Sequence, residues 1–380
     1  MSKLHKISMK DIDLGKPLRW NVTDSSGHLL LSEGYVIEKQ AQAEALVARG
    51  MYINHALADS IQNAAPPPPK TESRSVLHSI NLAVKRLGMV LRDIQQLPDA
   101  RKKILEIVQL IQHAISLNED LALASIQLNQ SSGHYPVRHC VDTAILAILV
   151  AQAMNKPEQE IQDITAAALT MNISMLNMQE KLQGRKEALF AREQAKIRQH
   201  PIASIKILHD AGIEDSDWLN YVLLHHEQED GTGYPIGKLK SEIPQNVKIL
   251  SLADAFCARV SARGYRKSFL PNVALRDIFI DNRARVDAIL GPYFIKVLGL
   301  YPPGTLVCLK NKEVAVISKR GANPSASVAY SLVNPNGEKV GIPIKRDTSV
   351  EPFTIAEAIY PTKTSVSVSM QQIWGPLASL

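Results

Sequence analysis

The chain has 380 residues and a formal net charge of +6, from 43 basic and 37 acidic side chains, and 45 % of its residues are hydrophobic. This length predicts two or three domains, each able to bury a core. No basic stripe interleaved with aromatic residues stands out, so we expect no nucleic-acid partner. The sequence has no apolar run of the roughly 20 residues that cross a bilayer and no N-terminal signal stretch, so we expect no membrane partner. Three widely spaced cysteines favour reduced thiols and a cytoplasmic location.

Residues 1–63 are predicted to form a small β-rich domain. Two apolar, strand-like runs flank the turn signal Asp-Ser-Ser-Gly at residues 24–27, and a short helix is expected to follow and to end at Gly50. Consecutive prolines at residues 66–69 exclude helix and favour polyproline II. Residues 64–74 are therefore interpreted as a semi-rigid linker.

Residues 75–130 are predicted to form a helical connector. Apolar side chains recur there at helical spacing, with an interruption at Pro98, at Leu77, Ile80, Val84, Leu87, Leu91, Ile94, Ile104, Val108, Ile111 and Ile115. This spacing fits an amphipathic helix pair that covers the core of the next domain. It also fits a helix that joins two copies in a homodimer, although the run is too short to indicate a coiled coil by itself.

Residues 131–300 alternate apolar-periodic helices with short loops, which predicts an all-helical domain. Beyond a Tyr-Pro-Pro-Gly turn, the composition changes to short β-branched runs such as EVAVISKR and SVAYSLVN, separated by turn residues. Residues 301–380 are therefore predicted to form a C-terminal β-rich unit, with a tail that gives no clear signal. The predicted fold class is mainly α, with an all-helical domain flanked by small β-rich units.

Two adjacent histidines, His225 and His226, follow the helical run WLNYVLL. Adjacent helical residues point about 100° apart, so the two rings would serve two metal ions, or one ion and one bound ligand. The glycines and proline of DGTGYP then force a tight turn around Tyr234, which could stack on or hydrogen-bond to a ligand. Histidine and carboxylate side chains ligate transition metals, and the candidates here are His139, His200, His225, His226 and Asp254.

Four segments between residues 131 and about 270 resemble the HD-GYP family. HHEQEDGTGYPIGKLKSEIP is similar to the family signature HHExxDGxGYPxGLxGxxIP, and KILSLADAFCARVSARGYRK resembles the segment that follows it. RQHPIASIKIL resembles the family's His-Pro helix, and YPVRHCVDTAILAILVA resembles its opening helix with a histidine. The first of these matches is dense and specific.

The resemblance implies a bacterial cyclic-di-GMP phosphodiesterase fold, in which a hydroxide on two or three metal ions, usually iron or manganese, opens the substrate. Two nearby cations lower the pKa of a bridging water and clamp phosphoryl oxygens, and mixed histidine and carboxylate ligands suit both metals. The resemblance implies that the metal ligands are His139, His200, His225, His226 and Asp254. It also implies that the dinucleotide is bound by Tyr234, Arg263, Arg266 and Lys267.

The sequence departs from the family in the segment TMNISM, residues 170–175, where the family pattern reads LHDIGK. Met171 and Asn172 stand at the positions of the histidine and the aspartate, Ser174 at that of the glycine, and Met175 at that of the lysine facing the substrate phosphate. A carboxylate bridges two cations and offsets their repulsion, whereas the amide of Asn172 is neutral and the thioether of Met171 suits neither Fe(II) nor Mn(II). Met175 removes a cation where electrostatic stabilisation is usually the largest catalytic contribution. Glu180 lies a helical turn or more from Asn172, and no nearby acid plainly substitutes.

Two interpretations of this departure stay open. In the first, Met171 and Met175 form one apolar helical face that packs into the former metal pocket. In the second, the site is remodelled and holds one ion at His200, His225, His226 and Asp254.

We therefore expect a catalytically degenerate regulator in cyclic-di-GMP signalling, which binds the dinucleotide or a protein partner and has no assigned catalytic residue. Contacts with a protein partner or a second copy are expected on the β-rich units and on the helix at residues 77–94. The alternative is an active metal-dependent phosphodiesterase with a reduced site of one or two iron or manganese ions.

Overall fold

The computed structural model describes residues 75–380 apart from 130–132, 186, 262–267, 283–284, 322, 324–325 and 361–365, together with parts of residues 4–54. The chain divides into two compact units, Met1–Glu72 and Ser73–Leu380. The expected linker at residues 64–74 lies outside the described residues.

The N-terminal unit contains a small antiparallel sheet in the order β1-β4-β2-β3. Its strands are β1 (Leu4–Lys6), β2 (Val22–Thr23), β3 (Leu29–Leu31) and β4 (Tyr52–Asn54). The predicted hairpin corresponds to the β2–β3 pair, in which Val22 is opposite Leu31. A small apolar cluster that includes Ile7, Val22 and Ile37 forms the core of this unit. Most of the helix predicted to end at Gly50 lies outside the described residues.

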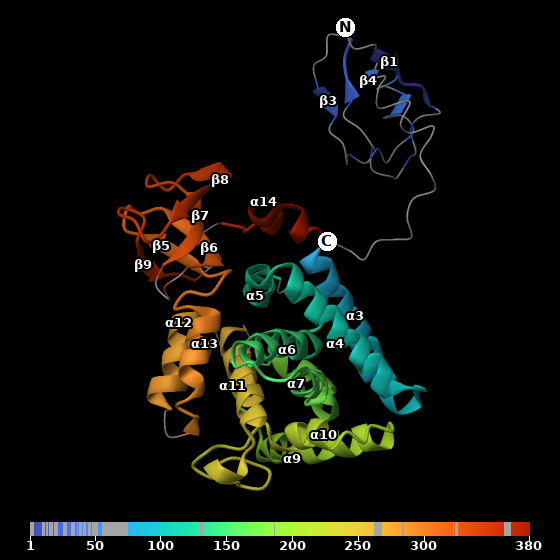
Figure 1. Ribbon diagram of the computed structural model, residues 1–380, viewed down its shortest axis with the longest axis vertical. Helices are drawn as coiled ribbons and strands as arrows, with labels where there is room; N and C mark the ends of the chain where they lie inside the picture. The colour runs from blue at the N-terminus through green and yellow to red at the C-terminus, as the bar shows by residue number, and fades with distance from the viewer. Residues whose placement is uncertain are drawn as a thin grey trace. The chain divides into compact units, whose positions relative to one another are not determined.

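Two long antiparallel helices open the second unit, α3 (Val76–Asp93) and α4 (Ala100–Leu117) (Figure 1). The side chain of Ser75 caps α3 by accepting a hydrogen bond from the backbone N–H of His78. The periodic apolar residues of both helices are buried in the same core as the rest of the helical domain. That face is covered by the chain itself, which favours the interpretation of a helix pair covering a core over that of a dimer seam.

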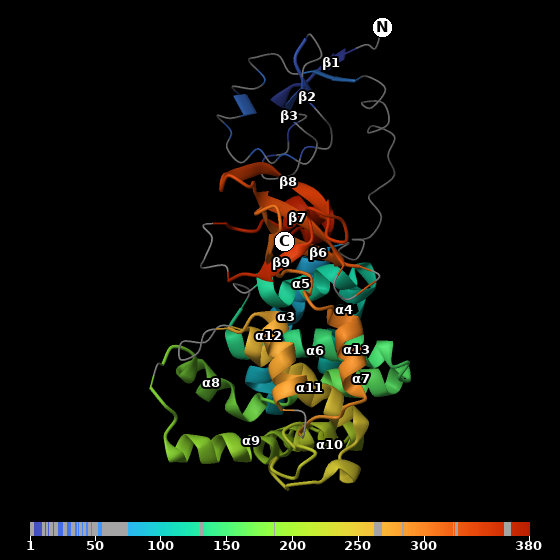
Figure 2. The same cartoon turned by 90° about the vertical axis from the view of Figure 1, so that its left-hand side faces the viewer.

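The centre of the helical domain is α6 (Tyr135–Ala153), which packs against α7 (Glu158–Thr170) and α11 (Gln245–Val260) (Figures 1 and 2). By length and hydropathy, α6 could cross a membrane, and it is the one helix of the described residues that passes this test. However, 83 % of its apolar window is buried inside the domain. Its apolar composition is therefore that of a core helix.

The remaining helices surround this centre. They are α5 (Glu119–Leu128), α8 (Leu176–Gln183), α9 (Ala191–Asp210), α10 (Ser216–Leu224), α12 (Pro271–Arg276) and α13 (Leu290–Leu298). Figure 2 shows α8 and α9 on one flank of the domain, with α9 running beneath α6 and α11. A π-helical turn at Asp277–Asp281 continues α12.

The C-terminal sheet has five antiparallel strands in the order β8-β7-β6-β5-β9. They are β5 (Leu306–Leu309), β6 (Val314–Arg320), β7 (Ser327–Val333), β8 (Lys339–Asp347) and β9 (Ile355–Ala358). With the helical domain and the N-terminal sheet, this gives the predicted class, a mainly helical fold with small β-rich units.

The C-terminal tail returns to the start of the helical domain, which the sequence did not indicate. It forms the short helix α14 (Met370–Trp374) and a 3₁₀ turn at Gly375–Ala378. The hydroxyl of Ser75 lies 3.1 Å from the carbonyl oxygen of Leu377 and 2.5 Å from that of Ser379. The first helix of the unit is thereby tied to its last residues.

Candidate functional site

The ring of His200 is oriented by the proline that follows it in α9. Pro201 has no backbone N–H, so the carbonyl of Ile197 receives no hydrogen bond from the residue four positions on. Nδ1 of His200 lies 2.6 Å from that carbonyl oxygen and donates to it. This bond fixes the tautomer, and Nε2 of His200 then carries a lone pair that points away from its own helix.

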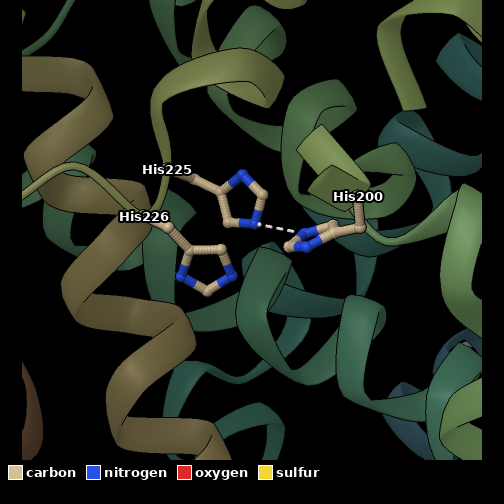
Figure 3. Close-up of side chains that lie close together, drawn as sticks. All are labelled: His200, His225 and His226. Carbon is tan, nitrogen blue, oxygen red and sulfur yellow. Dashed lines mark hydrogen bonds between the residues drawn. The ribbon is translucent and has the colours of Figure 1, made fainter. Parts of the chain in front are cut away.

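His225 is oriented in a similar way at the end of α10. The last carbonyls of a helix have no partner within the helix, and Val222 belongs to this last turn. Nδ1 of His225 donates to the carbonyl oxygen of Val222 at 2.7 Å, which leaves the lone pair on Nε2. The Nε2 atoms of His200 and His225 face each other at 3.2 Å (Figure 3).

Two lone pairs at this distance need a cation between them. A proton is disfavoured, because burial and the neighbouring His225 lower the pKa of His200 to about 3. Burial also lowers the pKa of His225 and of His226. The ligand nitrogens of His200, His225 and His226 all lie within 4.8 Å of one another. Three neutral imidazoles around one point fit a single transition-metal ion.

His139 and Asp254 form a separate pair beside these rings. Nε2 of His139 lies 2.7 Å from Oδ1 of Asp254, and both side chains are largely buried. Burial acts to raise the pKa of Asp254, but the hydrogen bond and charge of His139 outweigh it and hold that pKa below its usual value. The expected ligands therefore divide into a three-histidine cluster (His200, His225 and His226) and a His139–Asp254 pair.

The segment that departs from the family pattern forms the wall next to this pair. Met171 is fully buried in the main core, and Met175 is buried and lines the cavity beside His139. Asn172 is also buried, and among the described residues its Oδ1 has no hydrogen-bond partner. One neutral oxygen cannot offset the charges of two ions. The residues present fit one metal ion and do not fit a bridged pair.

A cavity of about 200 Å³ lies beside the three-histidine cluster. One wall is polar and includes His139, His226 and Asp254. The apolar lining comes from Met175, just before α8, and from α8, α9 and the loop between them, namely Met178, Leu182, Leu189 and Ile197; Gln179 and Gln183 of this region line the cavity as well. Typical small-molecule pockets have roughly 300–1,000 Å³, so this cavity admits part of a large ligand.

Tyr234 lines the cavity and contacts two rings of the cluster, His200 and His226. Its ring stacks on His226 with the ring centroids 4.7 Å apart. The guanidinium carbon of Arg198 lies 5.1 Å from the centroid of the Tyr234 ring, a cation–π contact on the solvent side. Burial raises the pKa of the Tyr234 phenol, so the ring stays neutral at physiological pH. Arg198 was not among the residues predicted from the sequence.

The turn that carries Tyr234 is held by a buried carboxylate. Glu227 accepts hydrogen bonds from the backbone N–H groups of Ile236, Gly237 and Lys238 at 2.7 to 3.1 Å. At Gly233, a Cβ atom would lie 2.4 Å from the backbone nitrogen of Gln228, so only glycine fits. Glu227 is the acidic residue directly after the paired histidines, and that position was its only sequence signal.

Ser174 connects the departing segment to the helix of His200. Its hydroxyl donates to the carbonyl oxygen of His200 at 2.9 Å and accepts from the hydroxyl of Ser204 at 3.0 Å. A glycine at this position would make neither bond. Sequence reasoning registered the replacement of glycine but did not anticipate this contact.

Comparison with known proteins is consistent with this geometry. The HD domain family matches residues 110–290. The chain is 27 % identical over 210 residues to the cyclic di-GMP phosphodiesterase PdeB of Borreliella burgdorferi, with 55 % of each chain covered. It is 26 % identical over 222 residues to the cyclic di-GMP phosphodiesterase PA4108 of Pseudomonas aeruginosa, covering 58 % of this chain and 53 % of that one. The helical domain of this chain is therefore similar to the HD domain family and to proteins named as cyclic di-GMP phosphodiesterases.

The chain spans about half the length of the curated relatives it matches. A solved HD-GYP protein, Bd1817 of Bdellovibrio bacteriovorus, is 16 % identical with a TM-score of 0.47, covering 78 % of this chain and 99 % of that one. Three basic residues that the sequence resemblance places near ligand phosphates lie outside the described residues, namely Arg263, Arg266 and Lys267.

Proposed function

We propose that this chain is a regulator in bacterial cyclic-di-GMP signalling, which binds the dinucleotide and relays its presence to a protein partner without hydrolysing it at the rate of a two-metal enzyme. One observation carries the proposal. Asn172 stands where the family places its bridging aspartate, and the remaining ligands of that position, His139 and Asp254, are bonded to each other at 2.7 Å.

The replacement of the bridging aspartate by Asn172 opposes two-metal hydrolysis for a chemical reason. A pair of ions stabilises the attacking and the leaving oxygen together, and a carboxylate between them lowers their mutual repulsion. The amide of Asn172 supplies no such charge, and Met175 supplies no cation for the phosphate. Loss of one electrostatic contact of this kind typically lowers the rate on the order of 10²–10³-fold.

The ligand side of the site supports binding. Tyr234, the stacked His226 and the exposed Arg198 present aromatic faces and a cation at the cavity. The curated relatives are named for cyclic di-GMP as their substrate. Because the cavity has about 200 Å³, a cyclic dinucleotide would place one nucleotide in it and extend over the rim.

Calorimetric titration of the full chain with cyclic-di-GMP tests the proposal, with chromatography of the same mixture for linear dinucleotide and GMP. We expect saturable binding and no product over hours with added Fe(II) or Mn(II). The absence of binding at high micromolar ligand would exclude the proposal and leave a scaffold for protein contacts. Rapid product formation would show an active enzyme.

A second function is favoured by the three-histidine cluster. A single hydrolytic metal ion can activate water, and His200, His225 and His226 fit one ion. Under this alternative the chain is a slow phosphodiesterase with one iron or manganese ion. This alternative is supported if the wild type and His209→Gln form product and His200→Gln, a variant on the same helix, does not.

A further inference from the structure

Phe190 stands at an unusual position for an aromatic residue. It is the N-cap of α9, where serine, threonine, aspartate and asparagine are preferred, and 56 % of it is exposed. The helix start is stabilised without the ring, because the carboxylate of Glu193 accepts the backbone N–H of Phe190 at 2.8 Å. The exposed ring is therefore not explained by the folding of α9.

Two arginines flank this ring. The guanidinium carbon of Arg185 lies 4.8 Å from the Phe190 centroid, and that of Arg192 lies 5.7 Å from it. Arg185 is held in place by both carboxylate oxygens of Glu193, at 2.8 and 3.0 Å. Within the described part of the chain, no carboxylate lies within ion-pairing distance of Arg192. The charge of Arg185 is thus paired with Glu193, whereas the Arg192 side chain is exposed.

The segment that carries Phe190 also contributes to the cavity of the proposed function. Leu189, the residue before Phe190, lines the apolar wall of that cavity. The segment joins α8 to α9 on the flank seen in Figure 2. A cyclic dinucleotide with one nucleotide in the cavity has its second base and phosphate outside it. Phe190 follows Leu189 directly in sequence, and both Phe190 and Arg192 are exposed.

We propose that Phe190 is a stacking platform for a guanine base of a cyclic dinucleotide, with Arg192 as the cation that contacts the base edge or the adjacent phosphate. Bases stack on aromatic side chains, and arginine pairs with the O6 and N7 acceptors of guanine and with phosphate oxygens. This inference rests on the proposed function, because it names a contact of the same ligand.

Titration of the full chain with cyclic-di-GMP is the test, for the wild type, Phe190→Leu and Arg192→Gln. Leucine keeps an apolar side chain and removes the aromatic face. Because stacking of a base is worth about 1–3 kcal/mol, we expect Phe190→Leu to weaken binding by about fivefold or more. We expect Arg192→Gln to reduce the preference for cyclic-di-GMP over cyclic-di-AMP.

Ile202→Ala is the matched control. Ile202 is an exposed apolar residue of the same helix, about 18 Å further along its axis, and its substitution should leave the affinity unchanged. If the wild type and Phe190→Leu bind cyclic-di-GMP equally well, Phe190 does not stack on a base, and the proposed function still stands. If Ile202→Ala weakens binding as much as Phe190→Leu does, the loss is not specific to Phe190, and the stacking role of Phe190 is also wrong. If the wild type does not bind, both proposals fail.

Discussion

The Nε2 atoms of His200 and His225 face each other at 3.2 Å (Figure 3). The Nδ1–H group of each ring donates a hydrogen bond to a backbone carbonyl oxygen. Both tautomers are set by the local backbone, by Pro201 in one case and by the end of α10 in the other. The two lone pairs are therefore aligned by the chain before any ligand arrives. We expect this arrangement to bind one transition-metal ion.

Substitution of His200 tests the metal site directly. His200→Gln removes one of three nitrogen ligands, and we expect the metal content after reconstitution to fall from one ion per chain to well below one. His209→Gln is the matched control, because His209 is an exposed histidine of the same helix. Elemental analysis and the visible spectrum of the Co(II)-loaded protein measure the effect. Equal metal content in both variants would contradict the three-histidine site.

The metal-free protein should lose stability in acid. The pKa of His200 is lowered to about 3 by burial, whereas an unfolded histidine titrates near about 6.5. Between these values the unfolded chain binds a proton that the folded chain does not, so stability falls as the pH decreases. The slope is about 1.4 kcal/mol per pH unit for each such group.

Comparison with a variant isolates this effect. Burial raises the pKa of Asp142 to about 8, so this carboxyl acts in the opposite direction over the same range. Urea unfolding of the metal-free wild type and of His200→Gln between pH 7 and pH 4.5 should show a shallower dependence in the variant. Parallel curves would mean that His200 is solvated or already protonated in the folded protein.

Restoration of the family residues should open a second metal position. In the double variant Met171→His, Asn172→Asp, the new carboxylate and imidazole join His139 and Asp254, which are bonded to each other in the present chain. We expect two ions per chain after reconstitution with Mn(II), together with hydrolysis of cyclic-di-GMP. The metal-free variant should be less stable than the wild type, because an imidazole replaces the buried thioether of Met171 and a charged carboxylate replaces the buried amide of Asn172. Elemental analysis that still finds one ion would place the obstacle outside residues 171–172.

The turn around Tyr234 should depend on Gly233. A Cβ atom there would lie 2.4 Å from the nitrogen of Gln228 and 2.5 Å from Cα of Glu227, both in the backbone. We expect Gly233→Ala to displace Tyr234 from His226 and to weaken cyclic-di-GMP binding by at least about tenfold, because contacts made by this turn shift together. Gly184→Ala, where a Cβ meets nothing within 4 Å, is the control. Unchanged binding by Gly233→Ala would show that the turn does not contact the ligand.

The sequence predicted the helices well because their apolar spacing is long and regular. The periodic residues from Leu77 to Ile115 lie in α3 and α4, and Pro98 falls between the two helices, as expected. The tail was not predicted, because α14 is short and its position depends on contacts with residues near the start of the domain.

The site was predicted only as a set of residues. The pattern identified His200, His225 and His226, which the structure brings together, but periodicity cannot show that His139 and Asp254 face each other. That pairing arises between α6 and α11, which are distant in sequence and adjacent in the fold. Arg198 and the contact of Ser174 with His200 were missed for the same reason, since the partners come from other elements.

The contact of Ser75 with Leu377 and Ser379 brings the two ends of the helical unit to one point. A folded unit whose ends meet can be grafted into a surface loop of a carrier protein without stretching either junction. The three-histidine cluster would be kept in such a graft, because its ligands come from α9 and from the two residues after α10, far along the chain from both junctions. The unit could therefore be inserted into another protein together with its three-histidine site.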